Sequence, residues 1–210
     1  MEGSKAFSKD FMKRHQIPTA GYQNFSEYEA ARKYLDSISH NVVIKASGLA
    51  AGKGVIIPAT KEEAQKALRD IMLDRQFGDA GNEVVIEEYL DGDELSVLTF
   101  CDGYSIKSLP PAQDHKRVFD GDKGPNTGGM GCYAPTTIAP QKVLDEIDRT
   151  IVQPTINGMR REGQITVRCT LIYRALTFNR LPFRGSSLYW PDDDEEWPQS
   201  TRIQCQRRRP

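Results

Sequence analysis

The stretch VVIKASGLAAGKGVIIP at residues 42–58 has two runs of β-branched residues on either side of a loop of small residues. Because β-branched residues favour strands and glycine lets the backbone turn sharply, this pattern predicts a strand, a flexible loop and a strand. Lys45 and Lys53 stand at the two ends of the loop. Backbone N–H groups and two ammonium groups suit an anion as highly charged as a triphosphate. The loop therefore predicts a cover for a polyphosphate, and an ordinary glycine hairpin is the alternative.

The loop does not match a Walker P-loop. That motif, GxxxxGK[ST], has four residues between its glycines, a hydroxyl side chain after its lysine, and a helix next. Here Gly48 and Gly52 have three residues between them, Gly54 follows Lys53, and a second strand comes next. A Walker fold is therefore not predicted.

Composition and charge exclude several classes of protein. The chain has 210 residues, 38% of them hydrophobic, which is enough for one large domain or two small ones. Its net charge of -1 argues against binding to nucleic acid or to a membrane surface. There is no apolar run long enough to span a bilayer and no signal-peptide pattern, so we expect a cytoplasmic protein. The four cysteines include no CxxC pair, which predicts neither a zinc site nor a disulfide framework.

The order of hydrophobic patterns predicts an α+β fold. Helical spacing appears in residues 8–15, after a capping box formed by Ser26 and Glu29, after a capping Thr60, and from Pro140 towards Gly163. Strand patterns appear at residues 42–44, 55–57, 84–90, 94–101 and 104–109. Residues 110–135 show no periodicity, which predicts a long functional loop.

Three stretches together carry a resemblance to a known family. They are the loop of residues 45–54, the segment EEYLDGDELS at residues 87–96, and the segment DKGPNTGGMGCYAP at residues 122–135. With them, residues 2–163 closely resemble ATP-grasp enzymes of the glycinamide ribonucleotide synthetase (phosphoribosylamine–glycine ligase) family. The string DHKRVFDGDKGPNTGGMG is specific within that superfamily.

This resemblance implies an ATP-grasp fold with a lid subdomain and an incomplete catalytic subdomain. The expected domains are a remnant at residues 1–15, the lid at 16–92, part of the catalytic subdomain at 93–163, and an aberrant, disordered tail at 164–210.

The resemblance also implies a set of nucleotide-binding residues. Lysines would contact the phosphates, the glycine loop would close over them, one glutamate would accept from the adenine amino group, and another would bind the ribose hydroxyls. The last two are Glu87 and Glu94, and a solvated strand end is the alternative for each. The complete set is Lys5, Lys45, Ser47, Gly48, Gly52, Lys53, Gly54, Glu87, Glu88, Tyr89, Leu90 and Glu94.

The implied reaction joins glycine to 5-phosphoribosylamine through a glycyl phosphate, giving glycinamide ribonucleotide, ADP and phosphate. ATP and Mg²⁺ (or Mn²⁺) are the implied cofactors. Positioning and charge neutralisation supply most of such catalysis, so no nucleophilic side chain is required. The candidates for the substrate region are Asp114, His115, Lys116, Arg117, Asn126, Gly128 and Gly129. For His115, an exposed histidine without a catalytic role is the alternative.

Several alternatives stay open at this stage. The chain is predicted to act on small molecules and to bind neither nucleic acid nor membranes, and the intact protein is compatible with fusion to other purine-pathway domains. One alternative is a nucleotide-binding fragment without catalytic activity. Another is a different ATP-grasp ligase that joins a carboxylate to an amine.

The residues after Gly163 depart from the family pattern. The family continues with an L-E-F-N segment whose acid and amide bind magnesium, and the tail lacks it, so the sequence predicts no metal ligands in this chain. Codons for residues 185–205 permit a family-like sequence ending in L-E-F-N when read one nucleotide later, so we expect an out-of-frame tail after an insert at 164–180. A divergent C-terminus is the alternative. The chain also begins inside the family sequence, so we expect an open sheet edge, weak ATP binding and no ligase activity.

Overall fold

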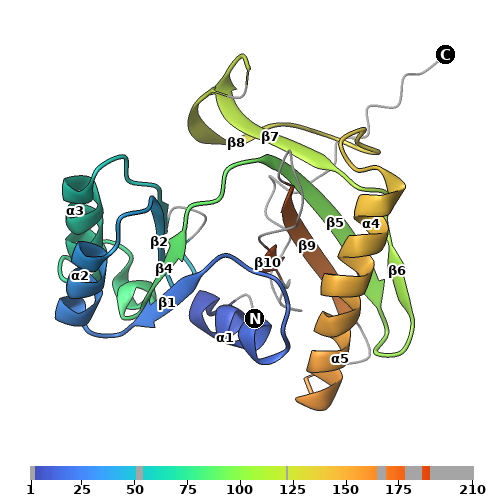
Figure 1. Cartoon of the computed structure of the whole chain (residues 1–210), viewed down its shortest axis with the longest axis horizontal. Coiled ribbons are helices and arrows are strands. Elements are labelled where there is room, and N and C mark those ends of the chain that lie inside the picture. Colours follow the sequence, from blue (N-terminus) through green and yellow to red (C-terminus); the bar gives the residue numbers. More distant parts are fainter. Residues whose placement is uncertain (1–2, 51–53, 122, 165–168, 178–185, 190–210) are drawn as a thin grey trace.

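The computed structural model describes residues 3–50, 54–121, 123–164, 169–177 and 186–189. These residues form two four-stranded antiparallel sheets and a separate two-stranded hairpin, with helices packed on the sheets (Figure 1). The predicted α+β class is confirmed. Among the described residues, no helix is long and apolar enough to cross a membrane.

The first sheet has the strand order β1-β4-β2-β3 and carries two helices on one face. Its elements are β1 (Tyr22–Phe25), α2 (Tyr28–Ser37), β2 (Val42–Ala46), β3 (Val55–Ile56), α3 (Lys61–Met72), a 3-10 turn (Gly78–Gly81) and β4 (Val84–Glu88). The apolar stripes of α2 and α3 pack on this sheet, so Ile44, Leu68 and Ile86 are almost fully buried between them. This unit contains the loop of residues 47–54 between β2 and β3, named the polyphosphate loop because the sequence predicts that it covers a polyphosphate.

The second sheet has the order β10-β9-β5-β6 and is covered by the long helical segment near residue 150. Its elements are β5 (Asp93–Cys101), β6 (Ile106–Ser108), α4 (Gln141–Ile147), a π-helical turn (Asp148–Val152), α5 (Gln153–Arg161), β9 (Cys169–Thr177) and β10 (Ser186–Tyr189). The alternating burial of β5 places Leu95 and Val97 in a core with Ile151.

Helix α1 (Lys5–Arg14) joins the two units. One side of it carries Phe11 and Met12 into the core of the second sheet. Another side carries Lys5 and Lys9 towards β2 and β4 of the first sheet. Helix α1 therefore helps to complete the core of the second sheet. The positions of the expected domain boundaries stay predictions.

The prediction that residues 110–135 form a loop is wrong in part. Most of it is a long hairpin of β7 (Gln113–Phe119) and β8 (Lys123–Tyr133). Its register shifts on both sides of Arg117, and glycines occupy much of β8. Bulges and glycines interrupt the two-residue alternation that identifies a strand in a sequence, which explains the error.

The prediction of disorder after residue 164 is wrong for β9 and β10. All nine residues of β9 pair with β5, and β10 pairs with β9. The expected open edge beside β5 is therefore occupied by a strand, because the backbone of residues 169–177 supplies the hydrogen bonds that the edge needs. Residues 165–168, 178–185 and 190–210 lie outside the described residues, and the frame-shift interpretation stays a prediction.

Of the two predicted N-terminal helix caps, the one at Thr60 is confirmed and the one at Ser26 is wrong. Ser26 does not cap α2: the helix begins at Tyr28, and its N-cap residue Glu27 makes no side-chain cap bond. Thr60 caps α3 as predicted, since its hydroxyl accepts from the Glu63 N–H at 3.2 Å. The Glu63 carboxylate in turn accepts from the Ala59 N–H at 2.8 Å.

Thr60→Ala is expected to lower the free energy of unfolding by about 1 kcal/mol, because it removes one partner of this reciprocal cap. Urea unfolding at neutral pH measures the change. Ser26→Ala is the matched control at the start of α2. It should change the free energy by less than about 0.5 kcal/mol, because that helix has no side-chain cap to lose.

Candidate functional site

A buried charged cluster lies between α1 and the first sheet. Glu87 is only 6% exposed, and each oxygen of its carboxylate pairs with a different lysine. Oε2 lies 2.9 Å from Lys9 Nζ, and Oε1 lies 2.9 Å from Lys45 Nζ. Lys45 and Glu87 share a face because Glu87 is paired with Val43, two residues before Lys45 on β2.

Lys5 extends the cluster towards the polyphosphate loop. It stands one helical turn before Lys9 on α1, and its Nζ donates to the Gly48 carbonyl oxygen at 2.9 Å. Lys5, Lys9 and Lys45 thus contribute three positive charges beside the single negative charge of Glu87. The structure therefore brings together Lys5, Lys45 and Glu87, which the sequence predicts as nucleotide-binding residues.

The pKa directions agree with an excess of positive charge. Burial lowers the pKa of Lys5, and the neighbouring charge of Lys45 lowers it further. Burial also lowers the pKa of Lys9, against the opposing effect of Glu87. Burial alone would raise the pKa of the Glu87 carboxyl, but Lys45 and Lys9 outweigh it and the pKa is lowered. An anion entering beside these lysines would relieve their mutual repulsion.

The start of the polyphosphate loop is anchored by backbone hydrogen bonds. The Ser47 N–H donates to the Glu83 carbonyl at 2.8 Å, and the Gly48 N–H donates to the Ala80 carbonyl at 3.1 Å. The Ser47 hydroxyl is buried, and it accepts from the Ala6 N–H at 3.2 Å. Contrary to the expectation for these two residues, their N–H groups already have protein acceptors. Their role in the structure is to fix the loop to α1 and to the 3-10 turn.

The other end of the loop returns to β2. The Gly54 carbonyl accepts from the Ala46 N–H at 2.9 Å. A Cβ on Gly54 would lie 2.6 Å from the Ala50 Cβ, so the backbone comes too close for a side chain there. The predicted residues Gly52 and Lys53 lie outside the described residues.

The segment after Glu87 forms the connection to the second sheet. The Glu88 carboxylate accepts from the Gly21 N–H at 3.4 Å, and the Tyr89 N–H donates to the Asn41 carbonyl at 3.0 Å. Leu90 and Glu94 are half-buried, and Glu94 lies near the start of β5. The connection is thus held to the first sheet by its backbone, with Glu87 at its buried end and Glu94 beyond it.

The predicted substrate residues lie on the β7–β8 hairpin. Asp114 is opposite Cys132, His115 is opposite Gly131, and Arg117 is opposite Asn126. The exposed His115 ring stacks on Tyr133 with centroids 5.7 Å apart. Figure 1 shows this hairpin at one end of the molecule, away from α1.

The base of the hairpin joins the second sheet, because Ser96 and Ala112 exchange backbone hydrogen bonds at 2.8 Å. Glu94 and Asp114 each lie two residues from this bridge, on adjacent strands.

Four of the substrate residues are described only in part. Lys116, Asn126, Gly128 and Gly129 have their backbone in β7 or β8. Their side chains lie outside the described part of the structure, so their expected roles stay predictions.

Lys9 is the residue that the sequence analysis missed. It is 4% exposed, pairs with Glu87, and donates to the Thr19 hydroxyl at 2.7 Å. Its spacing of four from Lys5 in a helix indicates a shared face, and that spacing was the available signal. The contact with Glu87 joins positions 78 residues apart, which no local pattern reveals.

The part of the chain that the structure describes contains no cluster of side chains that could bind magnesium. No group of three or more His, Cys, Asp or Glu side chains there could hold a metal ion. Mg²⁺ requires several hard oxygen ligands, and the described residues do not gather such a set.

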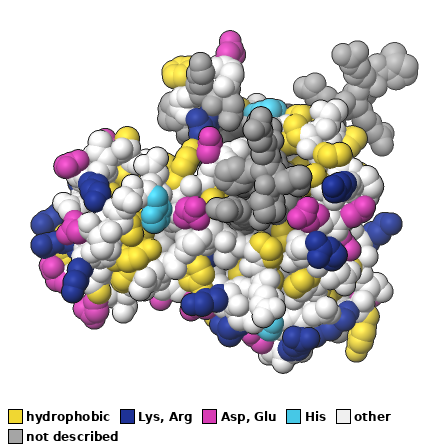
Figure 2. Space-filling model, in the orientation of Figure 1, with side chains coloured by type: hydrophobic (Ala, Val, Ile, Leu, Met, Phe, Trp, Pro, Cys, Tyr) yellow, Lys and Arg dark blue, Asp and Glu magenta, His cyan; other side chains and the backbone are white. Residues whose placement is uncertain are grey.

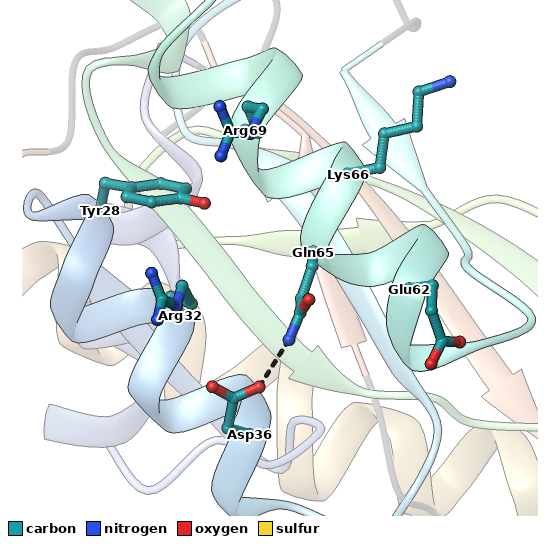
Figure 3. A pocket seen from close by; sticks show the side chains of 7 residues that line it. All are labelled: Tyr28, Arg32, Asp36, Glu62, Gln65, Lys66 and Arg69. Carbon is teal, nitrogen blue, oxygen red and sulfur yellow. Dashed lines mark hydrogen bonds between the residues drawn. The ribbon is translucent and has the colours of Figure 1, made fainter.

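A cavity of about 400 Å³ lies elsewhere, between α2 and α3 (Figure 3). It is lined by Tyr28, Arg32, Asp36, Glu62, Gln65, Lys66 and Arg69. Gln65 bridges the helices by donating to Asp36 at 2.6 Å. Figure 2 shows positive and negative side chains interleaved over this end of the molecule. A groove between helices that mixes three positive and two negative side chains does not point to a particular ligand.

The comparisons with known proteins fit this geometry. Residues 3–177 match the family described as phosphoribosylglycinamide synthetase, ATP-grasp (A) domain. The chain is 68% identical over 163 residues to the bifunctional purine biosynthetic protein ADE1 of Schizosaccharomyces pombe. It is 51% identical over 165 residues to the phosphoribosylamine–glycine ligase of Pseudomonas aeruginosa. The crystal structure of phosphoribosylamine–glycine ligase from Thermotoga maritima matches with a TM-score of 0.79 and 35% identity.

These matches cover most of this chain and a minor part of each relative. The yeast match covers 78% of this chain and 21% of that protein, and the Pseudomonas match covers 79% and 38%. The Thermotoga structure is matched over 89% of this chain and 47% of that one. The chain thus spans about a fifth to a half of the length of these proteins.

Proposed function

Since this chain belongs to the phosphoribosylglycinamide synthetase ATP-grasp (A) domain family, we propose that its lysine cluster binds the phosphates of ATP for a phosphoribosylamine–glycine ligase. The observation that carries the proposal is the excess of three ammonium groups over one carboxylate beside the polyphosphate loop. Such an excess is costly unless an anion offsets it. A nucleoside triphosphate supplies that charge, and the anchored loop is placed to cover it.

The chemistry we propose has two steps. A carboxylate oxygen of glycine attacks the γ-phosphorus of ATP, the bond to the β-phosphate oxygen breaks, and ADP leaves. The amine of 5-phosphoribosylamine then attacks the glycyl carbonyl carbon, loses a proton and releases phosphate, which gives glycinamide ribonucleotide. The contribution of Lys5 and Lys45 is to hold the phosphates and to offset charge that moves to the bridging oxygen.

The remaining details of the proposal follow from the family. We propose Glu87 and Glu94 for the adenine and ribose, and the β7–β8 hairpin, with Asp114, His115 and Arg117, for the substrates. Fusion to other purine-pathway domains is supported by bifunctional and trifunctional relatives. Mg²⁺ or Mn²⁺ and a cytoplasmic location belong to the same proposal.

Lys45→Met is expected to weaken ATP binding by about tenfold, because it removes one charge from the cluster and leaves the methylene packing in place. Isothermal titration calorimetry of the 210-residue chain with ATP measures the effect. Lys33→Met is the matched control, because Lys33 is an exposed lysine on α2 and takes no part in the cluster. Equal losses in both variants would contradict the proposed site.

Release of ADP separates the proposed ligase from the alternative of a nucleotide-binding chain. The assay mixes the chain with ATP, glycine and 5-phosphoribosylamine and compares the mixture with one lacking either substrate. ADP that appears only when both substrates are present supports the ligase. Binding of ATP without such release limits the function of this chain to nucleotide binding.

A further inference from the structure

Lys9 holds an unusual position for a lysine. It is 4% exposed, at a place on α1 where an apolar side chain would avoid the cost of burying an ammonium group. Its Nζ donates to the Thr19 hydroxyl at 2.7 Å, lies 2.9 Å from Glu87 Oε2, and lies 5.5 Å from the centre of the Tyr22 ring. A buried ion pair is a poor source of stability, so the folding of α1 does not explain this lysine.

The charges around Glu87 suggest what Lys9 contributes. Without Lys9, the Glu87 carboxylate would pair with Lys45 alone, and the two charges would cancel. With Lys9 on the second carboxylate oxygen, the positive charge of Lys45 is left over for another anion. Lys45 is the more accessible partner, because 23% of its side chain is exposed against 5% for Lys9.

We infer that Lys9 is a positioning residue that neutralises Glu87 through Oε2, the carboxylate oxygen that Lys45 does not contact. The charge of Lys45 then remains available to the polyphosphate. Lys9 itself does not touch the nucleotide. The inference rests on the proposed function, since it concerns how the same site obtains its affinity for phosphate. It predicts that Lys9 acts on binding of phosphates and not on binding of the nucleoside.

Three variants test this role: Lys9→Met, the double variant Lys9→Met/Glu87→Gln, and Lys13→Met. The single change removes one positive charge from the cluster, and the double change restores the original net charge. Lys13 is an exposed lysine on the same helix and is the matched control. Calorimetry measures the affinity of each variant for ATP, inorganic tripolyphosphate and adenosine, and thermal unfolding shows that each one is folded.

Lys9→Met is expected to weaken binding of ATP and tripolyphosphate by about tenfold, with adenosine changed less than about twofold. The double variant is expected to return to within about threefold of the unmodified chain for tripolyphosphate. Lys13→Met should change all three affinities less than about twofold. If Lys9→Met does not fold, the double variant still tests the inference, because it removes the nearly fully buried Lys9 charge together with its counter-charge. Binding of tripolyphosphate weakened by more than about threefold in the double variant would then contradict the inference.

Other results would overturn the inference. Equal losses for ATP and adenosine in Lys9→Met would indicate damage to the fold, and so would a double variant weaker than the single one. Unchanged tripolyphosphate binding in Lys9→Met would remove the role of Lys9 while leaving the proposed function intact. An unmodified chain that binds neither ATP nor tripolyphosphate would instead remove the proposed function, and the inference with it.

Discussion

Glu87→Gln is expected to lower the free energy of unfolding by about 3 kcal/mol at pH 7, because it leaves the buried Lys9 ammonium without a counter-charge. The amide keeps nearly the same shape and can still accept hydrogen bonds, so the loss reports charge and not packing. Lys9 is 4% exposed and its side chain has no easy route to water. Urea unfolding followed by circular dichroism measures the change.

Two further variants distinguish the charge effect from a local disturbance. Glu83→Gln makes the same chemical change just before β4, where the side chain forms no ion pair among the described residues, and it should cost less than about 0.5 kcal/mol. Lys9→Met/Glu87→Gln should recover at least half of the loss, since the nearly fully buried Lys9 charge is gone and only the more exposed Lys45 lacks its partner. A double variant as unstable as Glu87→Gln would show that the ion pair does not account for the loss.

The same pair makes a signed prediction about pH. The pKa of Glu87 is lower in the folded chain than its ordinary value of 4.5, so ionised Glu87 stabilises the fold. That stabilisation is fully present above the unfolded pKa and is lost as the pH falls through the lower, folded value. The difference in stability between the unmodified chain and Glu87→Gln should therefore be constant above about pH 5.5 and should shrink below about pH 4.

The sequence predicts β2, β3, β4 and the two helices of the first sheet, because local patterns determine these elements, but it does not predict β1. The β-branched runs on each side of the loop become β2 and β3, and residues 61–72 form the predicted helix after Thr60. Lys5, Lys45 and Glu87 come together as the resemblance implies. The strands and the helix depend on residue type and short spacing, which a single sequence records. Lys5, Lys45 and Glu87 are far apart in the sequence, and only the family resemblance groups them.

The features that the sequence misses depend on contacts between distant residues. Ser47 lies in a loop whose composition is typical of a phosphate-binding loop. In the structure, its hydroxyl accepts from the Ala6 N–H and its own N–H donates to the Glu83 carbonyl. Register shifts in the β7–β8 hairpin interrupt the two-residue alternation of side chains that would identify its strands in the sequence. β9 pairs along its whole length with β5, a strand about 70 residues earlier in the chain. In each case the partner, and not the segment itself, decides the structure.

Gly81→Ala is expected to lower the free energy of unfolding by about 3 kcal/mol through steric overlap. Gly81 ends the 3-10 turn and is buried against α3. A Cβ there would lie 2.5 Å from the Ile71 carbonyl oxygen and 3.1 Å from the Ile71 Cγ2 atom. Ile71 is fully buried in the core of the first sheet, so neither atom can move away easily. Thermal and urea unfolding measure the loss.

The matched control is Gly131→Ala in β8, where a Cβ would meet nothing within 4 Å. The same substitution there should change the stability by less than about 1 kcal/mol, because alanine only restricts the unfolded chain. Gly81→Ala should also weaken ATP binding, since the turn carries the Ala80 carbonyl that accepts from Gly48 at the start of the polyphosphate loop. Equal stability of the two alanine variants would show that the turn can move away from α3, and ATP binding would then be expected to stay unchanged.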